Sequence, residues 1–415
     1  MISRRQLLSH AICGCFLCVS KNSLAKPLTT DLGALIGSNY QPVDFDEKGI
    51  WHACDTLERN IAESDLLLRA SDLTEYTALV LERLLGKLAS DFRIYIVRDA
   101  AFNASMTPNG MMIVNTGLLA RVHSEAQYAT VIGHEAGHYL RKHSIDNWRD
   151  IRTKSAIGAF ASAGANAAAG YSASQGYSNG QSWIDLASSI NQALLASIFS
   201  YKREQESEAD AFGIKLLSDA NYTPESAAQV WGQLIAERQA SAKERNKRYR
   251  ENSNSAYSTH PPSEKRMRDL ADTAAALSAR SSSTVRSNGE SDWKSAVNPY
   301  LPDLFAEQIK LNDAGASLYL IESHAQAGWT GLLRFNEGEI YRLRGKSGDA
   351  SLAETAYATA VTFSDAPPEA WRANGYSLLK RGSRIDGISS LNHYLELKPN
   401  APDAAMVRFS ISQNH

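Results

Sequence analysis

The stretch Ser124–His143, SEAQYATVIGHEAGHYLRKH, decides how the rest of the chain is organised. It contains the pattern H-E-x-x-H, formed by His134, Glu135 and His138. Two residues that are four apart lie on the same face of a helix, so the two imidazoles can converge on one metal ion. Glu135 is then close enough to a metal-bound water to act as its general base. This arrangement is typical of a zinc hydrolase.

The residues around the motif favour a helix. Ser124 followed by Gln127 forms a capping box, and the next positions suit a buried helix: Ala126, Ala129, Val131 and Ile132. The motif alone leaves an alternative open. With 10 histidines and 45 acidic residues in 415, it can arise by chance on a partly exposed helix. A third ligand from elsewhere in the chain would favour the metal site.

A second block, Tyr201–Gly213, offers that ligand. Glu206 and Asp210 are four residues apart and therefore face the same way on a helix. Taken alone, the block is typical of an ordinary charged helix. Together with H-E-x-x-H, its pattern R-x-x-E-x-E-A-D-x-x-G resembles the HtpX and CAAX-prenyl-protease superfamily of zinc metallopeptidases, matched here by Arg203, Glu206, Glu208, Ala209, Asp210 and Gly213. The resemblance implies that Glu206 is the third zinc ligand and that Asp210 orients a ligand histidine. One zinc ion per chain is expected.

Two further candidates lie in the segment THPPSEKR, residues 259–266. The superfamily has an H-P-P segment with an arginine six residues after the histidine, which His260 and Arg266 match. The resemblance implies that His260 lies near the open zinc position. There it either stabilises the oxyanion of the tetrahedral intermediate or occupies the position and blocks substrate. The alternative is a surface histidine in a turn that begins a helix. Arg266 is grouped with Asp210 as a supporting residue.

The expected fold class is α+β and mostly helical, with a small sheet. Phe92–Val97 and Met111–Val114 predict two strands, the second following the turn at residues 108–110. The resemblance implies a gluzincin-type domain in which this second strand is the sheet edge beside the active site. Its backbone would pair with an extended substrate through the residues Met111, Met112, Ile113 and Val114.

Residues 1–25 predict an export signal, with Arg4 and Arg5 before a short apolar run and a cleavage site after Ala25. Both Sec and twin-arginine export suit this segment, and lipidation at Cys15 is a minor alternative. Three of the four cysteines lie within it, so the mature chain keeps only Cys54 and has no intrachain disulfide. The predicted location is the periplasm of a Gram-negative bacterium.

Charge and hydropathy exclude some partners. Removing the signal removes three cations and changes the formal net charge from −2 to −5. With no basic stripe, no nucleic-acid partner is expected. No later segment has 18 consecutive strongly apolar residues, so at most peripheral membrane contact is predicted. The uncharged segment 156–184 suggests small-residue helices around a loop at 171–180, hypothesised to form a lid or touch a membrane.

The C-terminal part carries a weak repeat. Residues 369–399 match the spacing of a tetratricopeptide unit through Trp371, Gly375, Leu378, Gly387, Leu391, Tyr394 and Pro399. An earlier unit aligns with it, and the alternative is a generic helical hairpin bundle. The predicted domains are a signal peptide (1–25), a zinc metalloprotease domain (26–283), a linker (284–300) and an all-α tetratricopeptide-like domain (301–415). Such stacks form concave surfaces for partner proteins.

The whole pattern resembles the BepA-type group of periplasmic proteases within this superfamily. The resemblance implies a zinc metalloendopeptidase that cleaves unfolded or misassembled envelope proteins in outer-membrane protein quality control. Its expected partners are such outer-membrane or periplasmic proteins and, through the repeats, the outer-membrane assembly machinery. The alternative function is a chaperone or adaptor that acts through the repeat domain, with the protease silent or autoinhibited.

Overall fold

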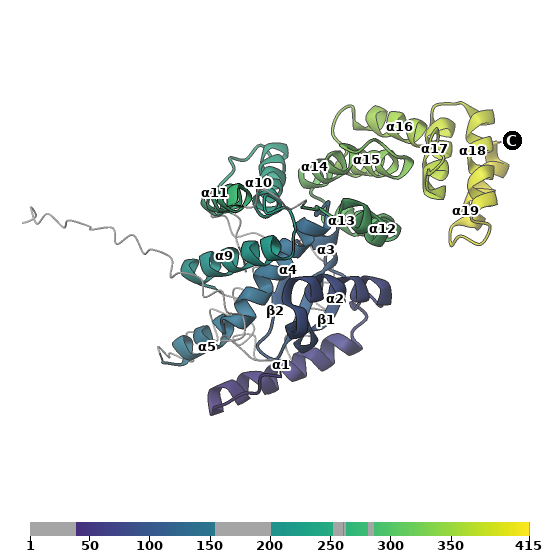
Figure 1. Ribbon diagram of the computed structural model, residues 1–415. Helices are drawn as coiled ribbons and strands as arrows, with labels where there is room; N and C mark the ends of the chain where they lie inside the picture. Colours follow the sequence, from purple (N-terminus) through teal and green to yellow (C-terminus); the bar gives the residue numbers. More distant parts are fainter. Residues whose placement is uncertain (1–38, 154–200, 252–259, 261–262, 281–285, 415) are drawn as a thin grey trace, which may run out of the picture.

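The computed structural model describes residues 39–153, 201–251, 260, 263–280 and 286–414 (Figure 1). Within these residues the chain is mostly helical, with one three-stranded sheet. The mostly helical α+β class expected from the sequence is therefore confirmed. The predicted export signal and the loop at 171–180 lie outside the described residues. None of the described helices is long and apolar enough to cross a membrane.

The first part of the chain runs from two helices through the sheet to the helix that carries the H-E-x-x-H motif. Its elements are α1 (Phe45–Glu63), α2 (Ser71–Leu85), a 3-10 helix (Gly86–Asp91), β1 (Arg93–Val97), β2 (Ala104–Met106), β3 (Met111–Asn115), α3 (Thr116–Leu119), α4 (Glu125–Leu140) and α5 (His143–Thr153).

The second part is helical. Helices α9 (Arg203–Asp219) and α10 (Ser226–Glu244) pack against α4, and α11 (Glu264–Arg280) packs against α9 and α10. The C-terminal elements are α12 (Glu290–Val297), a 3-10 turn (Asn298–Tyr300), α13 (Leu301–Lys310), α14 (Ala314–Ala325), α15 (Gly331–Arg344), α16 (Asp349–Ala360), α17 (Pro368–Lys380), α18 (Arg384–Leu397) and α19 (Ala404–Asn414).

The sheet has the strand order β1-β3-β2, with β3 parallel to β1 and antiparallel to β2. This corrects the prediction for Met111–Val114. The strand is the central one, hydrogen-bonded on both sides and buried along its length, so it cannot pair with a substrate. The edge beside α4 is β2. It has only three residues, and a strand this short leaves no alternating pattern to detect in a sequence.

The register shows which backbone groups of β2 face outward. Thr107 N–H donates to the Met111 carbonyl at 2.9 Å, and Asn115 N–H donates to the Asn103 carbonyl at 3.0 Å. Hydrogen-bonded pairs alternate along an antiparallel ladder, so Ser105 also bonds to β3. The N–H and C=O groups of Ala104 and Met106 therefore point away from β3.

Helix α4 is buried over its whole length, and α9 packs against it at very short range. Ser124 caps α4 by accepting a hydrogen bond from the Gln127 N–H at 3.2 Å. Where the helices cross, a Cβ placed on Gly213 would lie 3.0 Å from the backbone nitrogen of His134. Glycine at this crossing allows the backbones to approach. The approach brings the first turns of α9 next to the two motif histidines.

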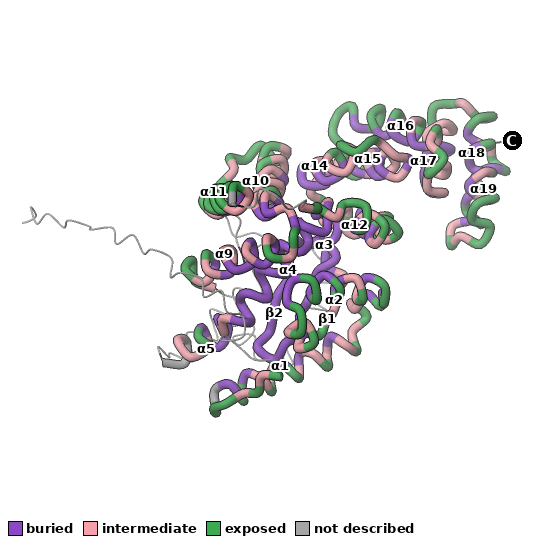
Figure 2. The backbone as a smooth tube through the Cα atoms, viewed as in Figure 1, coloured by how far each residue is buried: buried purple, intermediate pink, exposed green. Residues whose placement is uncertain are grey.

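One hydrophobic core runs from α2 through the sheet and α4 to the C-terminal helices (Figure 2). It includes Trp293 of α12, whose indole N–H donates to the Val122 carbonyl at 2.9 Å. The segment predicted as a linker, 284–300, thus contains a helix that buries Trp293 and Val297 in this core. Further along, α15 packs on α16 and α17 on α18. A separate small cluster, Leu391, Tyr394, Val407 and Ile411, closes the C-terminal end.

Candidate metal centre

Four buried side chains from three regions of the chain converge at one point. His134 and His138 come from α4, Glu206 from the first turn of α9, and His260 from just before α11. One ligand atom from each lies within 4.8 Å of the ligand atoms of the other three. The His260 side chain is only 8% exposed, so it is no surface residue.

The spacing of these atoms suits a tetrahedral ion. His134 Nε2 lies 3.1 Å from His138 Nε2 and 3.2 Å from His260 Nδ1. Glu206 Oε1 lies 2.8 Å from His260 Nδ1 and 3.6 Å from His138 Nε2. Zinc–nitrogen bonds of ~2.0–2.1 Å in tetrahedral geometry place neighbouring ligand atoms roughly 3.3 Å apart. The donor set of three histidines and one carboxylate therefore fits zinc in chemistry and in size.

Glu135 lies beside the four ligands without belonging to them. Its side chain is 1% exposed, and Oε1 is 3.3 Å from His260 Nε2. Its other oxygen, Oε2, is buried and has no hydrogen-bond partner among the described residues. Burial raises the pKa of this carboxyl, and nearby Glu206 adds to the rise against the opposing effect of the histidines. A buried carboxylate with a free oxygen and a raised pKa has the properties of a general base.

Arg266 forms ion pairs with two carboxylates at the centre, those of Glu206 and Asp210. Burial alone would raise the pKa of Glu206, but His260 and Arg266 hold it at about 2, so the carboxylate is ionised. Arg266 Nη1 lies 2.7 Å from Glu206 Oε2. The same guanidinium donates two hydrogen bonds of 2.8 Å to Asp210. Asp210 Oδ1 is in turn 3.0 Å from His134 Nδ1, where it fixes the tautomer and orientation of that imidazole.

The second motif histidine has partners that the sequence reasoning missed. His138 Nδ1 lies 2.9 Å from Nδ1 of His143, whose Nε2 is 3.2 Å from Glu208 Oε2. The ring of Tyr201 stacks on His138 at 3.6 Å, with 20° between the planes. Burial lowers the pKa of His143 to about 4, so its imidazole is neutral. Glu208 thus contacts the histidine that supports His138. The signal available in the sequence was a histidine five residues after the motif.

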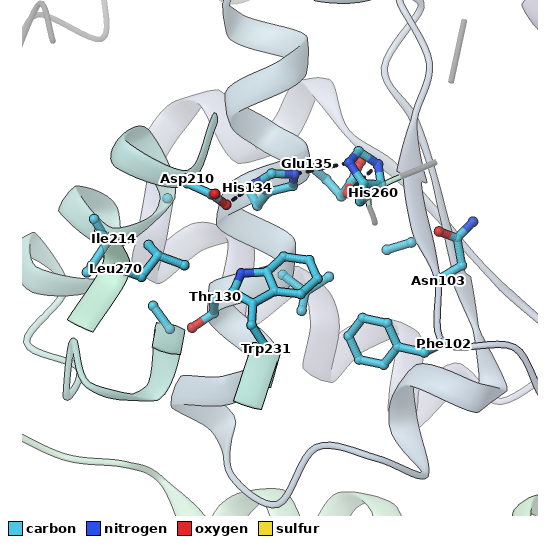
Figure 3. Close-up of a pocket in the computed structure, with 14 residues that line it drawn as sticks. Phe102, Asn103, Thr130, His134, Glu135, Asp210, Ile214, Trp231, His260 and Leu270 are labelled. Carbon is cyan, nitrogen blue, oxygen red and sulfur yellow. Dashed lines mark hydrogen bonds and ion pairs between the residues drawn. The ribbon is translucent and has the colours of Figure 1, made fainter. Parts of the chain in front are cut away.

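A small, mostly apolar pocket adjoins the centre (Figure 3). Phe102 and Asn103, which lead into β2, form one side of it, and Trp231 of α10 forms another. His134, Glu135 and His260 reach the same pocket. The edge strand β2 therefore begins beside the pocket that Glu135, His134 and His260 line. The strand predicted for this role, β3, does not line the pocket.

The fold and this constellation define a metallopeptidase domain. Residues 69–274, just under half of the chain, match the family described as Peptidase family M48. Both helices that carry ligands lie within the matched segment, as does His260.

The chain also resembles individual proteins. It is 27% identical over 202 residues to the mitochondrial metalloendopeptidase OMA1 of Schizosaccharomyces pombe, covering 48% of this chain and 52% of that protein. It is 31% identical over 143 residues to OMA1 of Arabidopsis thaliana, covering 34% and 26%. A putative beta-barrel assembly-enhancing protease of Vibrio cholerae is 25% identical over 215 residues, covering 50% and 41%. The chain thus spans about half the length, or less, of these curated relatives.

Proposed function

We propose that this chain is an exported zinc metalloendopeptidase that hydrolyses peptide bonds of unfolded or misassembled envelope proteins. The observation that carries the proposal is the convergence of four ligand atoms beside a buried carboxylate that keeps one oxygen free. Zinc, when bound by His134, His138 and Glu206, supplies Lewis acidity and lowers the pKa of a coordinated water.

The chain's own residues supply the rest of the mechanism. Glu135 accepts a proton from the attacking water and passes it to the leaving amine. Asp210 keeps His134 in one tautomer, and Arg266 keeps Asp210 in place. The outward backbone groups of Ala104 and Met106 align an extended peptide along β2 by strand addition. The apolar pocket beside Trp231 accepts a substrate side chain next to the scissile bond.

The position of His260 favours a resting state in which the protease is blocked. Its Nδ1 lies within hydrogen-bonding distance of both Glu206 and His134, inside the ligand set. If zinc is bound there, a histidine held within the ligand set would exclude the water on which hydrolysis depends. His260→Ala should then raise peptide cleavage. A loss of cleavage in this variant would instead assign His260 to oxyanion stabilisation.

The C-terminal helices are proposed to recruit substrates or to dock the enzyme at the outer-membrane assembly machinery. Support comes from the successive helix pairs α15–α16 and α17–α18, which suit a tetratricopeptide-like stack. A groove along α15, α16 and α17 is lined by Tyr341, Tyr357 and Tyr376 among charged residues. The Vibrio cholerae relative is named a putative beta-barrel assembly-enhancing protease, which agrees with a role in the envelope. The periplasm is the proposed location.

The deciding experiment compares the chain with its Glu135→Gln variant. Loss of the general base should reduce casein cleavage at least about 100-fold while the bound zinc content stays the same. Glu204→Gln is the matched control, because Glu204 is exposed on α9. If Glu135→Gln cleaves like the unchanged protein, the hydrolase assignment is wrong. If the variant is inactive in cleavage but supports cell function fully, the adaptor alternative holds.

A further inference from the structure

The two motif histidines are held by different kinds of partner. Nδ1 of His134 faces the carboxylate of Asp210 at 3.0 Å, the usual partner of a metal-binding imidazole. Nδ1 of His138 faces another imidazole, that of His143, at 2.9 Å. Two ring nitrogens at this distance share one proton, so one of them donates and the other accepts.

The directions of these hydrogen bonds follow from the ligand set. Nε2 of His138 points toward His134 and Glu206, where it has to be unprotonated to bind a metal. Its Nδ1 therefore carries the proton and donates to Nδ1 of His143. The proton of His143 is then on Nε2, which donates to Glu208 Oε2 at 3.2 Å. Glu208 is ion-paired with Arg141, so every donor in this series meets an acceptor.

The turn between α4 and α5 brings His143 back to the metal centre. Helix α4 ends at Leu140, and Lys142 takes a left-handed conformation with φ of 56°. Helix α5 then begins at His143, whose ring lies 5.0 Å from that of His138 at an angle of 72°. The His143 side chain is 4% exposed. Tyr201 covers the face of His138 and bonds through its hydroxyl to Ser144 at 2.9 Å.

We propose that His143 is a positioning residue for the metal: it holds His138 in the tautomer and ring orientation that present Nε2 to zinc. Glu208 supports it by fixing the tautomer of His143 itself. The proposal rests on the zinc site proposed above. Removing a partner of this kind typically weakens metal binding about 10- to 100-fold.

Three substitutions separate hydrogen bonding from packing. Counted in bonds from Cβ, the amide oxygen of asparagine stands where histidine has Nδ1, and the amide nitrogen of glutamine stands where histidine has Nε2. His143→Asn therefore keeps an acceptor for His138, whereas His143→Gln keeps only the outer contact to Glu208. His143→Phe keeps the ring and removes both hydrogen bonds.

The measurement is the zinc dissociation constant of the full chain, obtained by competition with a chromogenic chelator, together with the melting temperature of the metal-free form. We expect His143→Phe and His143→Gln to bind zinc about 10- to 100-fold more weakly, and His143→Asn to stay within about threefold of the unchanged chain. Glu208→Gln should show a smaller loss. Glu204→Gln on the exposed face of the same helix should show none.

The proposal is overturned if His143→Gln and His143→Asn weaken zinc binding equally, or if neither does. It is also overturned if the loss of affinity follows a loss of melting temperature in the metal-free form, since that marks a packing role. The Asn and Gln variants decide the matter even if His143→Phe does not fold. An unchanged chain that binds no zinc would instead overturn the proposed function, and this inference with it.

Discussion

At the scale of single residues, Arg266 balances the charge of the metal centre. It lies between the carboxylates of Glu206 and Asp210, and its guanidinium stacks over the Trp231 ring at 4.1 Å from the centroid. Burial lowers the pKa of the guanidinium, but the two carboxylates raise it by more and keep the group ionised. A buried charge group of this kind contributes little net stability, whereas removing one member is costly.

Arg266→Met should therefore destabilise the metal-free protein by about 3–5 kcal/mol, because two buried carboxylates lose their cation. The free energy of unfolding, measured with a chemical denaturant, tests this. The control is Arg268→Met on the exposed side of the same helix, where the pair with Glu264 at 3.5 Å is weak and a change within about 0.5 kcal/mol is expected. Equal effects of the two substitutions on the free energy of unfolding would contradict a special cost of removing the buried cation.

At the scale of elements, the crossing of α4 and α9 sets the distance between the metal ligands. Two ligands are on one helix and the third is on the other, so the site depends on how closely the helices approach. A Cβ on Gly213 would contact the His134 backbone nitrogen at 3.0 Å and the His134 Cα at 3.3 Å. These are backbone atoms within a buried helix, which cannot move aside as a flexible side chain can.

Gly213→Ala should force the helices apart by a few tenths of an ångström and cost about 1–3 kcal/mol of stability. It should also weaken zinc binding, because Glu206 moves away from His134 and His138. Unfolding free energy and zinc affinity are the two measurements.

Gly49→Ala in α1 is the matched control. A Cβ there meets nothing within 4 Å, and alanine favours a helix by about 1 kcal/mol over glycine, so this variant should be as stable or more stable. A Gly213→Ala variant with unchanged stability and zinc affinity would contradict the account of the crossing.

At the scale of the whole molecule, the first C-terminal helices are fastened to the metallopeptidase part by buried polar contacts. Arg121 donates two hydrogen bonds of 2.8 Å to Glu237 of α10 and one of 2.7 Å to Gln308 of α13. On α14, His324 Nε2 donates to the Ala120 carbonyl at 2.8 Å, and its ring contacts that of His123. Helices α13 and α14 therefore pack as part of the same body as α4.

This junction should be sensitive to acid. Burial, with contributions from His324 and Lys294, lowers the pKa of His123 from 6.5 to about 4. Between these values the unfolded chain binds a proton at His123 and the folded chain does not. The free energy of unfolding is therefore highest above pH 6.5 and falls as the pH drops towards 4. Protonation of His123 lowers it by at most about 3 kcal/mol.

His123→Gln removes that contribution. We expect the difference in unfolding free energy between pH 7 and pH 5 to be smaller in this variant by about 1–2 kcal/mol. His393→Gln on α18, outside this junction, serves as the control and should leave the contribution of His123 unchanged. An identical pH dependence of the His123 variant and the unchanged protein would show that His123 does not sense pH.

Much of the metal centre follows from the sequence alone, because helix periodicity is local. A spacing of four places His134 and His138 on one face, and the same spacing places Glu206 and Asp210 together. The capping of α4 by Ser124 and the strand at 93–97 also depend on neighbouring residues. Composition and these periods were enough to predict the mostly helical α+β class.

Only the tertiary structure decided which elements meet. It placed β3 in the centre of the sheet and β2 at the edge, since strand order depends on packing and a three-residue strand leaves no pattern. It turned His143 back onto His138 through a left-handed residue, and it buried Trp293 in a segment that was predicted to be a linker. Each of these outcomes depends on contacts between residues brought together by close packing, which local sequence spacing does not specify.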